Sequence, residues 1–485
     1  MKNRHARVAW IAAIAASALA LSPLVTTANA AVSSQSAAAP KKDNQSDKDT
    51  LQVGAARVDI TPTDPKYPAL NEYDHEKLNL RAIVFENHGH RGALIGADTV
   101  HIDAPIFTET IKAVAAELKT SPSNIIVSST HAHSAVVPGP AVSGPAWGNA
   151  PGYLANAALK AVKEAESDME PALMGYSTGS ADLNVNRDAI DPTTGKWTQA
   201  ANPDGPTDKA VAVLSFAHPD GSPIAAYVTY AMHPVNGYLG YYTSGDFPAA
   251  MSRWVEQSFN DKMVTVFAQN ASGDVNPLWL RTGTNVLASE SGVPITGYEM
   301  TREKVEQPVR DNVVTPVKPS DKSVHQLFDY IQSLGIVLGE EVIRIMSHTK
   351  ANEGNPTIWG ASDTVTCPGR TRLDNAREGV PGVYTDGPDV DIPTGMLGIG
   401  DVALANVGAE IYTRIGERIK AQSPMKNTMV VTLAEGKAAS GYIPDEQSWD
   451  HQTFQVLGSK LKPGCAEDGI ADSTTHMIQT YAHSR

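Results

Sequence analysis

Two histidines, His131 and His133, follow an apolar stretch of the chain and are separated by a single alanine. The stretch "NIIVSS" at residues 124–129 has the composition of a buried strand. Side chains two residues apart on a strand point to the same face, so the two imidazole rings would converge on one spot. Converging imidazoles are typical of a metal site or a proton-transfer site, and either kind needs further residues to complete it.

Three later segments also place polar side chains where an expected strand ends. The apolar run "IAAYVTYAMHP" finishes at His233, and "MVTVFAQNASGDVNP" runs into a polar loop that holds Asp274 and Asn276. Near the carboxyl end, "MLGIGDVALANVGAEIYTRIGERIK" predicts two strands and then a helix with Glu410 in its first turn. No structural requirement explains polar groups at four strand ends, so they are candidates for one functional site.

Several of these candidates combine into a zinc site. His131, His233 and Glu410 would supply two imidazoles and a carboxylate, the ligand types of a catalytic zinc ion that keeps one position open for water. Zinc lowers the pKa of a bound water to about 7, which produces hydroxide at neutral pH. His133, beside His131 but not on the metal, would accept the proton of that water and return it to the leaving group.

The order of the expected elements predicts how these residues are positioned. A strand at 92–98, a helix at 106–119 and the strand at 124–129 form a strand–helix–strand unit, and the pattern repeats over 224–277. Such units build an α/β fold of mixed, largely parallel sheets flanked by helices. Ligands bind beyond the carboxyl ends of parallel strands. Asp98 lies at such an end and is, for that reason alone, a candidate neighbour of the ligands.

Long polar stretches separate the regular segments. Residues 281–312 are too many for an ordinary connection, which favours a lid or a binding loop near the site, and residues 365–395 are equally rich in turn-forming residues. The sequence therefore predicts an active site bordered by long loops.

The chain resembles the catalytic domain of the neutral ceramidase family, which consists of zinc-dependent amidases that cleave the fatty acid from ceramide. The resemblance runs from residue 53 to residue 456 and lies in the order and spacing of short motifs. These motifs are "VGAARVDITP", "STHAHS", "NVNR", "DKAVAVLSF", "MHP", "SGDFPAAM", "SGDVNP", "GAEIYT" and "GYIPDEQSWDHQTFQV". The expected activity is hydrolysis of the amide of ceramide, or of another N-acyl lipid or N-acyl compound.

The resemblance also implies a role for each candidate residue. The zinc ligands would be His131, His233 and Glu410, with Tyr442 of "GYIPDE" as a fourth contact near or on the metal. The proton-transferring residue would be His133, and Arg187 of "NVNR" would lie beside the scissile amide. Arg187 and Tyr442 would stabilise the oxyanion that forms during attack on an amide. Asp274 and Asn276 would order the residues around it.

Three departures from the family's pattern concern the handling of substrate rather than the metal. Asn276 stands where the ceramidases carry a serine, and an amide cannot act as a nucleophile. Phe454 stands where they carry a pocket tyrosine, so a hydrogen bond to the polar head of the substrate is expected to be lost. The chain ends 43 residues after Tyr442, and the family's immunoglobulin-like carboxyl-terminal domain is expected to be absent.

The amino terminus predicts export. Residues 1–30 have a basic start, a short apolar run and an Ala-Asn-Ala cleavage site, the plan of a secretory signal peptide. Residues 31–50 lack large apolar side chains and are predicted to be a disordered linker, and residues 51–485 would form the hydrolase domain. We therefore expect a secreted protein with no stable membrane insertion.

The net charge of the chain narrows the classes of molecule that it is expected to bind. The formal net charge is −14, and removal of the three basic residues of the signal peptide makes it −17. Such an acidic chain is a poor candidate for binding nucleic acid or an anionic membrane surface.

The two cysteines, Cys367 and Cys465, can form a disulfide in an oxidising compartment or remain two free thiols. Their spacing excludes a zinc–cysteine site.

Two other functions fit parts of the sequence. "GYSTG" at residues 175–179 matches the pattern of a serine-hydrolase nucleophile around Ser177, but that motif needs a helix immediately afterwards, and a polar, turn-rich stretch follows instead. A non-catalytic, secreted metal- or lipid-binding protein with the same fold is the second alternative, and Asn276 and Phe454 are the features that permit it.

Overall fold

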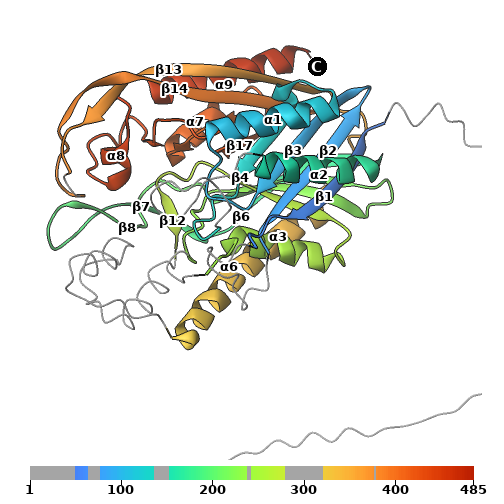
Figure 1. The fold of residues 1–485 in the computed structure, drawn as a ribbon, viewed down its shortest axis with the longest axis horizontal. Coiled ribbons are helices and arrows are strands. Elements are labelled where there is room, and N and C mark those ends of the chain that lie inside the picture. Colours follow the sequence, from blue (N-terminus) through green and yellow to red (C-terminus); the bar gives the residue numbers. More distant parts are fainter. Residues whose placement is uncertain are drawn as a thin grey trace, which may run out of the picture. The chain divides into compact units, whose positions relative to one another are not determined.

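The structure is a computed structural model that describes residues 50–63, 77–135, 152–237, 242–278, 320–375 and 378–484 (Figure 1). The expected signal peptide at 1–30, nearly all of the expected linker at 31–50 and the polar stretch at 281–312 lie outside these ranges. Within them, no helix combines the length and the apolar character that a membrane span requires.

A five-stranded sheet with strand order β4-β3-β2-β1-β5 forms the amino-terminal part of the fold. Its strands are β1 (Gln52–Asp59), β2 (Asn79–Asn87), β3 (His90–Ala97), β4 (Ile125–Ser129) and β5 (Glu170–Pro171); the short helix η2 (Pro122–Asn124) precedes β4. Helices α1 (Ala104–Leu118) and α2 (Tyr153–Ser167) lie over one face of this sheet (Figure 1). Helix α2 approaches β1 so closely that a Cβ on Gly54 would lie 1.9 Å from the carbonyl oxygen of Ala165.

A second sheet, with order β11-β10-β9-β6, packs against the free face of the first. Its strands are β6 (Leu173–Ser180), β9 (Ala210–Ala217), β10 (Pro223–Tyr230) and β11 (Val264–Gln269). The rings of Phe85 and Phe216 stack across the two sheets with centroids 6.2 Å apart. Helices α3 (Asp246–Ser258) and α6 (Asp321–His348) cover the outer face of the second sheet, so two sheets lie between two pairs of helices.

The carboxyl-terminal part contributes a third sheet with order β13-β14-β15-β17. Its strands are β13 (Ile358–Arg372), β14 (Tyr384–Ile399), β15 (Val402–Val407) and β17 (Asn427–Thr432), and α7 (Thr413–Gln422) and α9 (Ala466–Ser484) pack on it. Residues 365–395, for which the turn-rich sequence predicts loops, lie largely in the long antiparallel β13–β14 ribbon. Strand pairing supplies the hydrogen bonds that the local sequence does not specify.

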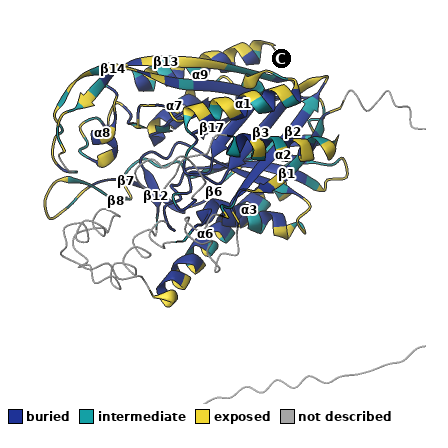
Figure 2. Cartoon of the chain, viewed as in Figure 1, coloured by how far each residue is buried: buried dark blue, intermediate teal, exposed yellow. Residues whose placement is uncertain are grey.

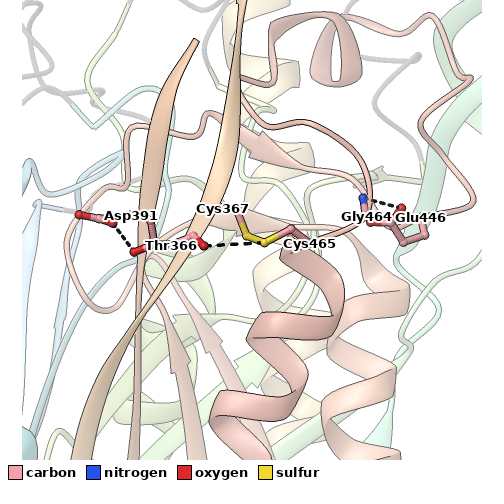
Figure 3. The surroundings of a disulfide bond; sticks show 6 residues. All are labelled: Thr366, Cys367, Asp391, Glu446, Gly464 and Cys465. Carbon is pink, nitrogen blue, oxygen red and sulfur yellow. Dashed lines mark hydrogen bonds between the residues drawn. A yellow bond between two sulfur atoms is a disulfide. The ribbon is translucent and has the colours of Figure 1, made fainter. Parts of the chain in front are cut away.

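Cys367 and Cys465 form a disulfide that ties this ribbon to the start of α9 (Figure 3). The two residues are 98 positions apart, and Cys367 is fully buried. Of the two alternatives that the sequence leaves open, the structure therefore has the disulfide.

Small elements complete the fold where strands of the larger sheets end (Figure 1). They are the three-stranded sheet of β12 (Val275–Pro277), β7 (Asn184–Ile190) and β8 (Trp197–Asn202), the two-stranded sheet of β16 (Glu410–Ile411) and β18 (Tyr442–Ile443), and helix α8 (Phe454–Gly458).

The mixed α/β class is confirmed, although parallel pairs are the minority. Among the described strands, nine pairings are antiparallel and four are parallel. The parallel pairs β3–β4, β10–β11 and β15–β17 are each joined by one of the helices α1, α3 and α7, as the strand–helix–strand pattern predicts. The antiparallel pairs differ from the expectation because several successive strands are joined by tight turns, which allow only that direction.

A buried ion network joins α3 to the first sheet and allows a test of the fold. The carboxylate of Glu256 accepts bonds from Arg81 Nε at 2.9 Å, Arg57 Nη1 at 2.5 Å and the backbone N–H of Thr265 at 3.0 Å. Glu256 is fully buried. Removing one partner of a buried ion pair leaves an uncompensated charge and typically costs about 3–5 kcal/mol.

We therefore expect Glu256→Gln to lower the free energy of unfolding by about 3–5 kcal/mol in chemical denaturation. The matched control is Asp261→Asn, because Asp261 pairs with the same Arg57 at 3.2 Å but is half exposed. That variant should lose less than about 1 kcal/mol, as exposed ion pairs do. Equal losses in the two variants would contradict the assignment of stability to the buried network.

Candidate metal centre and active site

Three side chains from distant parts of the chain converge on one point. His131 Nε2 lies 3.1 Å from His233 Nε2 and 3.0 Å from Glu410 Oε2, and His233 Nε2 lies 3.1 Å from the same carboxylate oxygen. Both histidines are buried, and Glu410 is nearly so. The structure thus brings together the three residues that the sequence analysis combined into a metal site.

Strand ends deliver these side chains, as expected for an α/β fold. His131 follows β4 and His233 follows β10, whereas Glu410 opens the two-residue strand β16. The expectation that Glu410 lies in the first turn of a helix is wrong, since α7 begins three residues later, at Thr413. Strand β16 pairs in parallel with β18, and in this register Glu410 lies directly beside Tyr442.

The backbone at His131 adopts an uncommon conformation. Its φ angle is 66°, in the left-handed region that residues other than glycine seldom occupy. Such conformations cost free energy and persist where the surroundings enforce them, often at functional sites. Here the backbone N–H of His131 donates to Thr99 O at 3.0 Å, and its ring Nδ1 lies 2.6 Å from Val100 O.

The other ring nitrogen of His131 and of His233 is hydrogen-bonded to the backbone. A backbone carbonyl can only accept a hydrogen bond, so Nδ1 of His131 donates to Val100 O, and Nδ1 of His233 donates to Ser272 O at 2.8 Å. A ring whose only proton is on Nδ1 offers a lone pair at Nε2. A divalent metal ion between the two Nε2 atoms and the carboxylate oxygen would therefore bind all three. The donor set fits such an ion.

His133 also lies close to this centre, although the sequence analysis does not count it among the metal ligands. Its Nε2 lies 3.3 Å from His131 Nε2, and the ring nitrogens of His131, His133 and His233 all lie within 4.8 Å of one another. Burial and the two neighbouring imidazoles lower the pKa of His133 well below its usual value, and burial with the charge of Arg187 lowers the pKa of His233 to about 3. Both rings are therefore neutral at pH 7.

Tyr442 and Arg187 border the centre on one side. The phenol oxygen of Tyr442 lies 3.3 Å from His233 Nε2, and burial together with the nearby Glu410 raises the pKa of this phenol, which keeps it protonated. The guanidinium of Arg187 is buried, with its carbon 5.3 Å from the ring centroid of Tyr442 and 5.3 Å from that of Phe454. The structure thus places both predicted oxyanion donors at the site.

Asp274 and Asn276 contact the residues that carry the site. Asp274 accepts hydrogen bonds from the backbone N–H and the hydroxyl of Thr413, each at 2.8 Å, and so holds the turn that follows Glu410. Burial and the charge of Asp188 raise the pKa of Asp274 to about 7. Asn276 Oδ1 accepts from Arg187 Nη1 at 3.1 Å.

Arg187 is fixed further by the backbone carbonyl of Gly273, the residue before Asp274. Its Nε and Nη2 both donate to Gly273 O, at 3.1 and 2.6 Å. Neither Asp274 nor Asn276 contributes an atom to the converging group, and their contacts hold Thr413 and Arg187 in place.

Two other candidates lie elsewhere in the fold. Asp98 accepts the backbone N–H of Asn79 at 2.8 Å and lies 3.5 Å from Arg81 Nη1, which places it in the ion network with Glu256. Ser177 lies inside strand β6 and pairs with Val213, so it lacks the strand-to-helix turn of a serine nucleophile. The serine-hydrolase alternative loses its structural basis.

The sequence analysis missed a buried carboxylate, Asp188, that joins three parts of the site. Its Oδ2 accepts from Tyr412 OH at 3.1 Å and from His451 Nδ1 at 2.9 Å, and its Oδ1 accepts from Gln455 Nε2 at 3.3 Å. Asp188 follows Arg187, whereas Tyr412 lies two residues after Glu410. Its position next to the arginine of "NVNR" was the only sequence signal, and no spacing links it to its partners.

Comparison with known proteins clarifies the architecture. The sequence matches no protein-family model and no curated protein. The structure, however, is similar to a ceramidase complexed with C2, with a TM-score of 0.64 and 14% identity over 90% of this chain and 76% of that one. It has a ceramidase-like fold.

A second ceramidase-like neighbour supports the same conclusion. The neutral ceramidase from Pseudomonas aeruginosa aligns with a TM-score of 0.62 and 14% identity over 90% of this chain and 75% of that chain. The expected fold is confirmed.

The donor set predicts that the purified protein retains about one equivalent of a divalent metal. We expect His131→Ala and His233→Ala to lose this metal, because each removes one of two imidazole ligands, and elemental analysis measures the content. His325→Ala is the control, since this histidine lies on the exposed side of α6. Loss of metal from the control, or full retention in both site variants, would contradict the assignment.

We expect Asp188→Asn to lower the free energy of unfolding without loss of the metal. The variant turns one acceptor oxygen into a donor that faces other donors, and a buried unsatisfied group costs about 1–3 kcal/mol of unfolding free energy. Metal content should remain unchanged, because Asp188 contacts none of the converging atoms. Asp191→Asn, in the turn of the same β7–β8 hairpin, should stay within about 0.5 kcal/mol of wild type. A neutral effect at Asp188 would show that these contacts do not stabilise the fold.

Proposed function

We propose that the protein is a secreted, zinc-dependent amidohydrolase that removes the acyl group from ceramide or from another N-acyl lipid or N-acyl compound. The observation that carries this proposal is the convergence of His131 Nε2, His233 Nε2 and Glu410 Oε2, with each pair of atoms 3.0–3.1 Å apart, on a ceramidase-like fold. Two imidazoles and one carboxylate are the ligand set of a well-known group of catalytic zinc sites.

Zinc supplies two things when bound: it lowers the pKa of a water molecule to about 7, and it polarises the carbonyl of the substrate. His133 accepts a proton at Nε2 and returns it to the leaving amine. Its ring suits this role because burial keeps it neutral, and its backbone N–H is held by Pro234 O at 3.0 Å. His133 could also serve as a third imidazole ligand, and the experiment below separates the two roles.

Arg187 and Tyr442 stabilise the oxyanion that forms when the amide carbonyl is attacked. The guanidinium is fixed by Gly273 O and Asn276 Oδ1, and the phenol is protonated, so both groups present N–H or O–H donors without rearrangement. Donors that are held in place before the reaction contribute several kcal/mol to catalysis, because no reorganisation is needed in the transition state.

An N-acyl lipid is the favoured substrate class because both structural neighbours are ceramidases. Phe454 lies against Tyr442 with ring centroids 5.6 Å apart and gives this side of the site an apolar surface. Secretion is supported by the signal-like residues 1–30 and by the Cys367–Cys465 disulfide, since disulfides persist in oxidising compartments.

The test measures zinc content and the hydrolysis of ceramide and a panel of other N-acyl amides. We expect His133→Ala to keep its zinc but to lower kcat by about 10²- to 10⁴-fold, the usual contribution of a proton-transferring residue. Ser177→Ala should retain full activity, because Ser177 lies in the middle of a strand.

Two results would overturn parts of this proposal. Loss of zinc from His133→Ala would make His133 a metal ligand. Stoichiometric zinc in a folded protein that hydrolyses none of the amides would leave the non-catalytic binding protein as the remaining function.

A further inference from the structure

Exposed apolar side chains gather at one end of the described structure. Six large hydrophobic residues are exposed within the described ranges, and five of them belong to three segments: the end of β7, the turn between β13 and β14, and α8. These five, named here the apolar rim, are Ile190 (54% exposed), Leu373 (63%), Val380 (41%), Val383 (56%) and Phe454 (37%). The sixth, Val337, lies on α6.

The three segments adjoin one another. Gly379 donates its backbone N–H to Gln452 O at 2.8 Å, which joins the β13–β14 turn to the residues before α8. A Cβ on Gly379 would lie 3.0 Å from Trp197 O, and Trp197 pairs with Ile190 across the β7–β8 hairpin. Figure 2 shows exposed residues along the neighbouring ends of β7–β8 and β13–β14.

The apolar rim is continuous with the candidate active site. Phe454 belongs to both, because its ring lies 5.6 Å from that of Tyr442 and 5.3 Å from the guanidinium of Arg187. The β13–β14 ribbon is fastened to α8, since Arg370 Nη2 donates to Val456 O at 2.5 Å and Tyr384 OH donates to Leu457 O at 3.1 Å. The rim therefore keeps a fixed position relative to the metal centre.

The charges beside the apolar rim bear on the kind of partner surface that the rim could contact. Single exposed apolar residues are ordinary, but a group of them on adjoining segments marks a contact surface. Charges of both signs accompany the group: Asp191 and Lys196 on the β7–β8 hairpin, and the Arg372–Asp374 ion pair at 3.0 Å in the β13–β14 turn. The chain as a whole is acidic, at −14, and would be repelled by an anionic membrane.

We propose that the apolar rim docks on the surface of a lipid bilayer with zwitterionic head groups. Aliphatic side chains enter the boundary between head groups and acyl chains, and the neighbouring pairs of opposite charge match head groups that carry both a phosphate and an amine. Docking would set Phe454 and the active site against the membrane. In this arrangement the site would take up an N-acyl lipid from the bilayer, and that part of the inference rests on the proposed function. Binding to the bilayer itself is independent of the proposed function.

The experiment compares the full chain with two variants in flotation assays with phosphatidylcholine vesicles. Leu373→Asp combined with Val383→Asp places two charges in the apolar rim, and we expect the bound fraction to fall at least fivefold. Val337→Asp places the same kind of charge on an equally exposed residue of α6, and binding should remain that of wild type. Thermal unfolding and metal content confirm that each variant is folded.

Turnover separates this proposal from the proposed function. A short-chain, water-soluble N-acyl amide should be hydrolysed equally by all three proteins, whereas an N-acyl lipid embedded in the vesicles should be hydrolysed at least tenfold more slowly by the double variant. Vesicle binding without any turnover supports docking and contradicts the hydrolase.

Three results would overturn docking. They are a wild-type protein that does not float with the vesicles, a loss in Val337→Asp equal to that of the double variant, and a wild-type dimer that the double variant dissociates. The last result would assign the rim to contact between copies of the chain.

Discussion

The site depends on the close approach of three polar atoms, His131 Nε2, His233 Nε2 and Glu410 Oε2. Because the Nδ1 atoms of His131 and His233 are bonded to main-chain carbonyls, their Nε2 atoms and the carboxylate of Glu410 point into the same small volume. A cation in the middle would hold two imidazole nitrogens and a carboxylate oxygen together. The surrounding structure anchors them from outside: His131 has a left-handed backbone conformation, and its backbone N–H and its Nδ1 are bonded to Thr99 O and Val100 O.

Two buried carboxylates, Asp274 and Asp188, hold the segments that carry these side chains. Asp274 binds the backbone and the hydroxyl of Thr413, and Asp188 binds Tyr412, so both act on the turn that carries Glu410. Asp188 also lies next to Arg187 in β7, and through Gln455 it holds α8. One network thus connects the segments that carry Glu410, Arg187 and Phe454, which belong to two small sheets and helix α8.

The sequence predicts the parts of this molecule that local pattern determines. Alternation of apolar strand and amphipathic helix is visible around α1, α3 and α7, and polar residues at the ends of the parallel strands identify His131 and His233 as site residues. Pairing partners are not visible in the same way. The β13–β14 ribbon contains prolines, glycines and aspartates that indicate loops in isolation, and its strands are stabilised by each other. Asp188 escaped notice because its partner Tyr412 is 224 residues away.

The two-residue strands β16 and β18 make the candidate active site sensitive to the register of a single strand pairing. Glu410 and Tyr442 are neighbours only because the two short strands align in one register. A shift of this pairing by one residue would bring Gly441 or Ile443 opposite the carboxylate and move the phenol away from it. Insertions or deletions directly beside either strand should therefore disturb the site, whereas those in the loops farther along the connection can be absorbed without changing the register.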